Sequence, residues 1–229
     1  EAYLTKLDEL FSTSQKVSGR DMKDISGLIG QYAHGNEPSH HLAYLFSFAG
    51  QPWKTQQKVR QIMDSFYTNA PDGLIGNEDC GQMSAWLILS AMGFYPVTPG
   101  SDIYVLGTPW FKEVEVQLEN GKTFTITADH PSAKSFYVQQ VRLNGQDYDK
   151  SFIRHQDIKS GSHLHFELGK HPNKTWGNPP ENRPKSTIQD HLLLPMPYID
   201  SPDKRIRRSI QISMGAPIKG SEIYYTLDG

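Results

Sequence analysis

Two adjacent carboxylates, Glu78 and Asp79, stand between glycines at the start of an apolar run, in the stretch GNEDCGQMSAW. One interpretation is structural, because Asp79 can cap a helix while Glu78 interacts with the helix dipole, for about 1–2 kcal/mol together. The other is chemical, because glycines let a substrate approach a carboxylate that acts as a base or binds a cation. The two interpretations are compatible, since a capping carboxylate keeps a free oxygen.

A second polar cluster, HGNEPSHH, occupies residues 34–41. Its spacing matches no zinc signature such as HExxH. Three interpretations stay open, which are a zinc site, solvated groups at a helix start, and sugar or cation binding. Asn, Glu and His beside aromatic residues are the types that hydrogen-bond hydroxyl-rich ligands. The substrate-binding candidates here are therefore His34, Asn36, Glu37 and His40.

Three isolated residues carry weaker signals. Trp53, in GQPWKTQ, could stack on a sugar face, although a tryptophan after a helix-ending glycine is more often part of the core. Cys80 is the only cysteine, which excludes a disulfide framework and a cysteine-rich zinc site. We expect it to be an inert buried thiol. Asn173 begins the sequon NKT, a short match for a glycosylation site.

Helices must position most of these residues. Apolar spacing predicts helices near residues 3–11, from about 38 to 50, from about 55, and from after Asp79 to near Gly93. The last of these is apolar on nearly every side, which predicts an inner helix packed all round.

Beyond Pro96 the apolar period changes from 3.6 to 2. Alternating strands separated by Asn120–Gly121 and Asn144–Gly145 predict an antiparallel sheet, in a sandwich. A stretch rich in Pro, Asn and charge follows, which predicts a linker. The predicted organisation is 1–96 helical, 97–175 antiparallel β, 176–202 linker and 203–229 the start of a truncated β module.

Bulk composition narrows the class of protein. The 229 residues are 37% hydrophobic and 21% charged, which allows a packed core. The net charge of −2, without a basic block, argues against a nucleic-acid binder. No apolar run reaches 18 residues, so no membrane span is predicted. Because the chain opens without Met and already in a helical pattern, we expect an excised piece, and a missing signal peptide says little about location.

Four blocks together carry a family resemblance, namely HGNEPSHH, AYLFSFAGQPWKTQ, GLIGNEDCGQMSAW and SAMGFYPVTPG. In this order they resemble the C-terminal part of the bacterial α-mannosidases of glycoside hydrolase family 92, over about residues 1–175. The resemblance implies an α+β multidomain fold, with part of an (α/α)6 helical barrel, an antiparallel β-sandwich-like region and a partial C-terminal β module. It also implies a secreted, periplasmic or cell-surface protein of a bacterium.

The activity that the resemblance implies is an exo-acting, inverting, calcium-dependent α-mannosidase, which removes terminal α-linked mannose from N-glycans or mannans. It assigns the general base to Asp79, with Asn77 or Glu78 assisting. Glu37 would contact the sugar in the leaving-group subsite. Asn36 stands where α-1,2-specific relatives have His, so the linkage stays open, and the calcium ligands are not identified.

Inverting hydrolysis needs two carboxyl groups about 6.5–9.5 Å apart. The block that carries the family's general acid is absent, so we expect this fragment to be inactive without the missing N-terminal part of the same chain. Two other functions stay open, a non-catalytic carbohydrate-binding or structural fragment and a different helical-barrel enzyme such as a glycoside phosphorylase. A phosphorylase would need a phosphate pocket, and no clustered Arg or Gly-rich anion loop lies near the acids.

Overall fold

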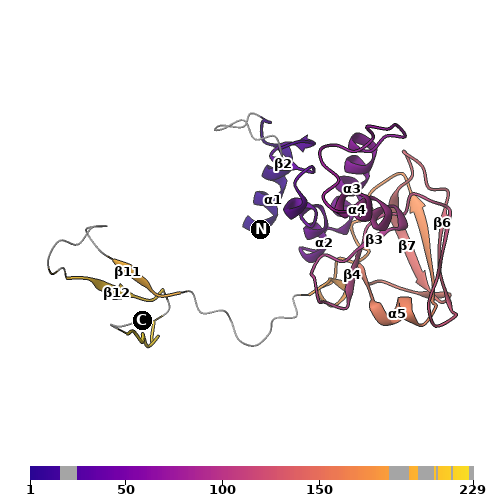
Figure 1. The fold of residues 1–229 in the computed structure, drawn as a ribbon. Helices are drawn as coiled ribbons and strands as arrows, with labels where there is room; N and C mark the ends of the chain where they lie inside the picture. The colour runs from indigo at the N-terminus through magenta and orange to yellow at the C-terminus, as the bar shows by residue number, and fades with distance from the viewer. Residues whose placement is uncertain (16–24, 186–195, 201–208, 210, 218, 227–229) are drawn as a thin grey trace. The chain divides into compact units, whose positions relative to one another are not determined.

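The computed structural model describes residues 1–15, 25–185, 196–200, 209, 211–217 and 219–226. It contains two compact units, residues 1–185 and residues 186–229. Helices and strands both contribute to the first unit, which confirms the predicted mixture of α and β structure. Within that unit the helices α1 to α4 gather on one side and the strands β6 and β7 lie on the other (Figure 1).

Three helices lie where apolar spacing predicts them, namely α1 (Ala2–Ser12), α3 (Pro52–Phe66) and α4 (Gln82–Met92). Helix α3 begins slightly earlier than expected, because a proline suits the first turn of a helix. Between α1 and α3 the strands β1 (Leu28–Ile29) and β2 (Tyr32–Ala33) form a short antiparallel pair. The buried faces of these elements share one hydrophobic cluster.

The continuous helix predicted from about residue 38 to 50 is wrong. The segment forms two 3-10 turns, η1 (Glu37–Ser39) and η2 (Leu42–Tyr44), followed by the short helix α2 (Leu45–Phe48). One physical reason is that the carbonyl of His40 accepts the indole N–H of Trp86, at 3.1 Å, in place of a backbone amide of its own helix. A tertiary contact thus replaces the regular α-helical hydrogen bond.

Helix α4 is less enclosed than its sequence predicts. Met83 and Trp86 are fully buried, but Ile88 is 59% exposed. An apolar cavity of about 250 Å³ also opens beside Ile88 and Phe111. One side of this predicted inner helix is therefore uncovered among the described residues, as expected if the chain holds only part of the barrel.

Two sheets follow the helices. The smaller contains β3 (Phe94–Tyr95), β4 (Ile103–Leu106) and β9 (Phe152–Arg154), all antiparallel. The larger has the strand order β5-β6-β10-β7-β8. Its strands are β5 (Glu113–Gln117), β6 (Thr123–Asp129), β7 (Tyr137–Leu143), β8 (Gln146–Asp147) and β10 (His163–Gly169). The helix α5 (His155–Lys159) joins β9 to β10.

The predicted hairpin turns are confirmed, but the predicted strand directions are not all correct. Asn120–Gly121 joins β5 to β6, and Asn144–Gly145 joins β7 to β8, with antiparallel pairing in both cases. Strands β6 and β10 pair in parallel, with Ile126 opposite Leu164, so the sheet is mixed. Apolar alternation has the same period in parallel and antiparallel strands, and it could not reveal this pairing.

Residues 176–185 belong to the first compact unit, although the sequence predicts that a linker begins at 176. Trp176 is only 5% exposed and packs in the cluster that the two sheets share. The backbone N–H of Ser151 also donates to the carbonyl of Asn182, at 2.8 Å, which ties the turn η3 (Pro180–Asn182) to the sheets.

The second unit is described only in part. Its strands β11 (Tyr198–Asp200) and β12 (Ser213–Gly215) pair in antiparallel fashion. Much of the predicted linker and terminal module lies outside the described residues, at 186–195, 201–208, 210, 218 and 227–229. None of the helices in the described ranges is long and apolar enough to span a membrane.

Candidate functional site

The two polar motifs of the sequence meet in the structure. A Cβ placed on Gly76 would lie 3.6 Å from the Cα of Gly35 and 2.6 Å from Oγ of Ser26. A Cβ on Gly35 would lie 3.2 Å from the carbonyl oxygen of Ile75. The Ser26 hydroxyl is the nearest group to both glycines, and the two backbone segments come within van der Waals reach of each other beside it. We call the polar rim on either side of this contact the acidic lip, made of Asn36, Glu37, Asn77, Glu78 and Asp79.

Glu78 caps helix α4 from outside its first turn. Its Oε1 accepts the backbone N–H of Ser84 at 3.2 Å, and its Oε2 accepts the N–H of Gly81. Hydrogen bonds from the side chain and backbone of Ser84 hold the pKa of Glu78 below its usual value. The N-cap residue itself is Gly81, so the interpretation of Asp79 as the cap is wrong.

Asp79 stands on an unusual backbone turn. Asp79, Cys80 and Gly81 all have left-handed φ angles, of 54°, 56° and 96°. A non-glycine residue in this region costs of order 1–3 kcal/mol, and such strain is concentrated at functional sites. With this turn, the Glu78 carboxylate bonds to the start of helix α4. The Asp79 residue is half-buried, and its carboxylate has no partner among the described residues. Cys80 is exposed, which corrects the expected buried thiol.

The rest of the acidic lip is also unpaired. Asn36, Glu37 and Asn77 are exposed, and no described group bonds their side chains. Asn36 precedes the turn η1 without capping it through its side chain. The lip thus offers two amides and two carboxylates, while its fifth residue, Glu78, is occupied by the helix.

His34 lies beneath the acidic lip, in the core. Its Nε2 is 2.6 Å from Oη of Tyr67, and that hydroxyl donates to the carbonyl of Met83 at 3.2 Å. Because Tyr67 donates there, it accepts the Nε2 proton, which leaves Nδ1 to accept the hydroxyl of Tyr32 at 2.8 Å. Burial, with the nearby His40, lowers the pKa of His34 to about 3, so the ring is neutral.

His40 stacks on His34, with ring centroids 4.6 Å apart. Its Nε2 donates to the His34 carbonyl at 2.9 Å, and its Nδ1 accepts from Nε2 of Gln82 at 3.0 Å. Burial lowers the pKa of His40, and the charges of Glu37 and Asp79 act in the opposite direction. The carboxylates of Glu37 and Asp79 therefore lie within electrostatic reach of one buried ring.

The structure thus brings five predicted site residues to the surface together and places the two histidines below them. His34 and His40 are 0% and 1% exposed, and all four of their ring nitrogens have partners. Sequence reasoning missed Gln82, which also donates to Oη of Tyr95 at 2.9 Å. The available signal was a polar residue at the start of an otherwise apolar run.

Trp53 lies apart from this arrangement. It is half-buried in the first turn of α3, and the ammonium groups of Lys54 and Lys174 lie 5.5 and 5.4 Å from its ring centroid. None of its described contacts joins it to the acidic lip. The sequon residue Asn173 is engaged locally, because its Oδ1 accepts the backbone N–H of Thr175 at 3.0 Å.

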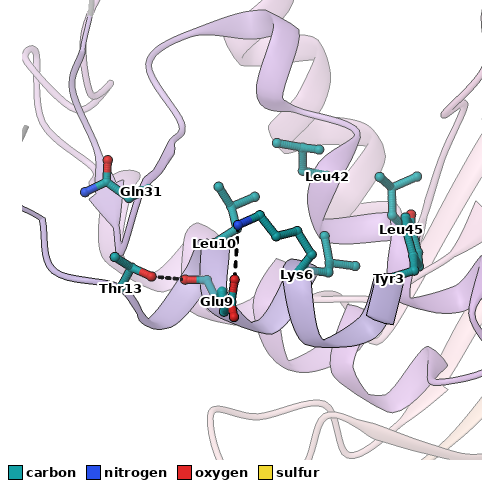
Figure 2. Close-up of a pocket in the computed structure, with 9 residues that line it drawn as sticks. Tyr3, Lys6, Glu9, Leu10, Thr13, Gln31, Leu42 and Leu45 are labelled. Atoms are coloured by element: carbon teal, nitrogen blue, oxygen red, sulfur yellow. Dashed lines mark hydrogen bonds and ion pairs between the residues drawn. The ribbon is translucent and has the colours of Figure 1, made fainter. Parts of the chain in front are cut away.

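A hollow near helix α1 is apolar. A cavity of about 400 Å³ lies between α1 and the segment of Leu42 and Leu45 (Figure 2). Four leucines and Tyr3 line it, and the charged pair on its rim, Lys6 and Glu9, forms a 3.1 Å ion pair. It lacks the convergent free polar groups that bind a sugar.

A metal site needs several ligand side chains at one point. Within the described ranges, no three His, Cys, Asp or Glu side chains come together to hold an ion. The histidine cluster is therefore not a zinc site.

Comparison with known proteins gives the family. Residues 1–170 match the sequence model of the glycosyl hydrolase family 92 catalytic domain. A family 92 α-mannosidase of Bacteroides thetaiotaomicron, solved with mannoimidazole, is 44% identical with a TM-score of 0.78, over 81% of this chain and 24% of that one. A family 92 inverting mannosidase of the same species is 38% identical with a TM-score of 0.69, over 80% and 26%.

A more distant relative is an uncharacterized secreted glycosidase of Arthroderma benhamiae. It is 30% identical over 155 residues, which are 66% of this chain and 20% of that protein. The chain therefore spans about a fifth to a quarter of the length of these relatives. The family match covers well over half of the chain, and the chain belongs to glycoside hydrolase family 92.

Proposed function

We propose that this chain supplies the general-base side of an exo-acting, inverting α-mannosidase. The substrate would be a terminal α-linked mannose of an N-glycan or mannan. The proposal rests on a difference between the two neighbouring carboxylates of the acidic lip. Glu78 is bonded to helix α4, whereas Asp79 is held on a strained turn with an unpaired carboxylate. Strain and a free carboxylate are typical of a catalytic group.

In this mechanism Asp79 accepts a proton from a water molecule, which attacks the anomeric carbon on the face opposite the leaving group. The bond to the glycosidic oxygen breaks, and a second carboxyl, from outside this chain, protonates that oxygen. The anomeric configuration inverts. A lone base cannot complete the reaction, so the fragment alone is proposed to be inactive.

The other lip residues have supporting roles in the proposal. Glu37 and Asn36 would bind the leaving-group sugar, because both are exposed and unpaired on the turn that abuts the base. Asn77 would help to orient the water. Glu78 is a positioning residue, since its carboxylate closes the turn that carries Asp79.

His34 and His40 would support the lip rather than contact sugar, because neither has an exposed or unpaired nitrogen. Trp53 keeps its predicted role as a stacking residue, at a point that no described contact joins to the lip. The barrel of which residues 1–96 would be part, and the β-sandwich character of residues 97–175, belong to the same proposal.

Calcium enters the proposal as a requirement of the longer protein. Oxygen atoms are the ligands that calcium prefers. Among the described residues no three His, Cys, Asp or Glu side chains come together, so the ion would need amide or backbone oxygens, or ligands from the rest of the longer protein. We assign no step of the reaction to the ion.

The longer protein is proposed to be secreted, periplasmic or on the cell surface of a bacterium. The description of the Arthroderma benhamiae relative as secreted supports the first of these locations. Its proposed partners are mannose-containing glycans and the N-terminal part of its own chain.

The test uses the full-length protein and a set of linkage-defined α-mannobioses, with and without a calcium chelator. We expect release of mannose, first as the β-anomer by NMR, and loss of turnover with the chelator. Release of the α-anomer would overturn the inverting mechanism. Unchanged turnover with the chelator would overturn the calcium requirement, and no release from any linkage would overturn the function itself.

A further inference from the structure

A second polar hollow lies in the sheet half of the molecule. Its volume is about 390 Å³, which is within the range of about 300–1,000 Å³ for ligand sites. None of the acidic-lip residues lines it. Its lining includes Gln139, Asp149, Asn173, Thr175, Trp176 and Asn182.

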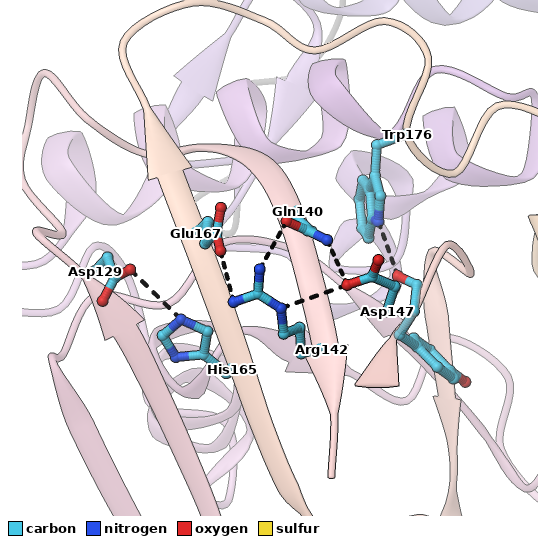
Figure 3. Close-up of polar contacts among 8 residues, drawn as sticks. Asp129, Gln140, Arg142, Asp147, His165, Glu167 and Trp176 are labelled. Carbon is cyan, nitrogen blue, oxygen red and sulfur yellow. Dashed lines mark hydrogen bonds and ion pairs between the residues drawn. The ribbon is translucent and has the colours of Figure 1, made fainter. Parts of the chain in front are cut away.

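The frame of this hollow is fixed by hydrogen bonds. Oδ1 of Asn173 accepts the backbone N–H groups of Thr175 and Trp176, at 3.0 and 3.3 Å, and its Nδ2 donates to the carbonyl of Gln139 at 2.9 Å. The indole of Trp176 donates to the carbonyl of Tyr148 at 3.1 Å, and Figure 3 shows this contact. The loop and strand β7 are therefore held together before any ligand arrives.

Three polar groups at this hollow are left unpaired. Both Nε2 protons of Gln139 are used, by the carbonyls of Tyr137 at 3.0 Å and His171 at 2.9 Å, so its Oε1 is free. The carboxylate of Asp149 is exposed and has no described partner. The side-chain amide of Asn182 is also unpaired among the described groups, although its backbone N–H and carbonyl are both bonded.

The hydrogen-bonding capacity of these three groups indicates the class of ligand. Two acceptors and one amide suit hydroxyl groups, which donate and accept at once. The carboxylate disfavours anions, and no metal cluster exists among the described residues. The partly exposed ring of Pro179 adds a small apolar surface beside these groups, while Trp176 closes the hollow from below with its buried ring.

We propose that this hollow, the β-side sugar site, binds a sugar residue of a glycan away from the acidic lip. Binding of a sugar does not depend on the proposed hydrolysis, but the identity of that sugar as part of a mannan rests on the proposed function. The site would increase the affinity for a long glycan, because two linked contacts on one chain reinforce each other.

The test uses the full-length protein with Asp79→Asn as the parent, because this change should slow hydrolysis while binding is measured. Affinity for α-mannan, dextran and xylan is measured with and without the double change Asp149→Ala and Asn182→Ala. The matched control is Glu119→Ala, which removes an exposed carboxylate that has no described partner. Asp149→Asn, which keeps the shape of the side chain, is a second variant if the double variant unfolds.

For whichever of the three polysaccharides the parent protein binds, we expect the double change to weaken binding about tenfold, because two hydrogen-bonding side chains are lost. The control should bind like the parent. In the background with Asp79 intact, turnover of a small aryl α-mannoside should not change. Equal binding by the double variant, or no polysaccharide binding at all, would overturn the site. Residue-dependent sugar binding without any mannosidase turnover would refute only the proposed function.

Discussion

The helical half and the sheet half of the first unit use polar contacts in opposite ways. In the helical half, His34 and His40 are buried, and every ring nitrogen has a partner. In the sheet half, Arg142 lies on the outer face of the sheet, where it pairs with Glu167 at 2.7 Å and Asp147 at 3.4 Å (Figure 3). More than a third of the Arg142 side chain is exposed.

This difference in burial predicts that the contacts of the two halves contribute unequally to the free energy of unfolding. A buried donor or acceptor that loses its partner costs about 1–3 kcal/mol. An exposed ion pair contributes only about 0–1 kcal/mol, because water replaces the lost partner. The acidic lip rests on the buried type of network, so changes there should affect function, whereas changes on the sheet face should have little effect.

The largest expected effect is at Asp79. In the full-length enzyme, Asp79→Asn should lower kcat by about 10²–10⁴, the usual scale for loss of a general base, while the fold survives. Asp72→Asn, a change of an exposed aspartate in the preceding loop, is the matched control. Turnover of an α-mannoside and the thermal midpoint are measured together. A folded variant with less than a tenfold loss would remove Asp79 from the mechanism.

The second effect concerns the buried histidines and pH. The unfolded His34 has an ordinary pKa of 6.5, and the folded one a pKa of about 3. As pH falls, the unfolded chain takes up the proton first, so this contribution to stability is complete above pH 6.5 and is lost toward pH 3. The slope reaches about 1.4 kcal/mol per pH unit.

Urea unfolding of the full-length protein between pH 7.5 and 4.5 measures this slope. His34→Phe should make the dependence shallower and should lower stability at pH 7.5 by about 1–3 kcal/mol, because the Tyr32 hydroxyl loses its partner. His171→Gln, at an exposed position, should leave the slope unchanged. An unaltered slope in His34→Phe would show that the ring is not the titrating group.

The third effect separates the two neighbouring carboxylates. Glu78→Ala should lower kcat about tenfold, because the turn that carries Asp79 loses its hydrogen bonds to Ser84 and Gly81. Glu78→Gln should restore much of that loss, since an amide oxygen still accepts a hydrogen bond. If Glu78→Gln were as inactive as Asp79→Asn, Glu78 would be the base.

The fourth effect is at Glu37. Glu37→Ala should lower kcat/KM for a mannobiose about tenfold and change turnover of an activated aryl mannoside less, because the aryl group depends less on binding in that subsite. Glu1→Ala, at an exposed position, is the control. Equal losses on both substrates would contradict a role in binding the leaving group.

Much of the first unit could be predicted from sequence, because its helices and strands have regular apolar periods. Helices α1, α3 and α4 and both hairpins follow this signal. The exceptions depend on contacts distant in sequence. The His40 carbonyl accepts a hydrogen bond from Trp86, which interrupts the expected helix. Strand β10 pairs with β6 in parallel, and no local sequence pattern predicts this pairing.

The candidate site was predictable in composition but not in geometry. The two polar motifs contain all five residues of the acidic lip, and their glycines do permit close backbone packing. The motifs could not show that Glu78 would cap α4 while Asp79 stayed free, because that depends on three left-handed residues. Burial of His34 is likewise a tertiary property, produced by Tyr32 and Tyr67.

The smallest expected effect is on the sheet face. Arg142→Gln removes the ion pairs with Glu167 and Asp147, but both carboxylates are more than a third exposed and can be hydrated instead. We expect a stability change below about 1 kcal/mol, further reduced in 0.5 M salt, because ions screen exposed charges. Activity should not change, since the acidic lip belongs to the helical half. Urea midpoints at low and high salt measure this. A loss above about 2 kcal/mol, insensitive to salt, would show that the sheet network contributes as much to stability as the buried histidines do, and the contrast between the two halves would be wrong.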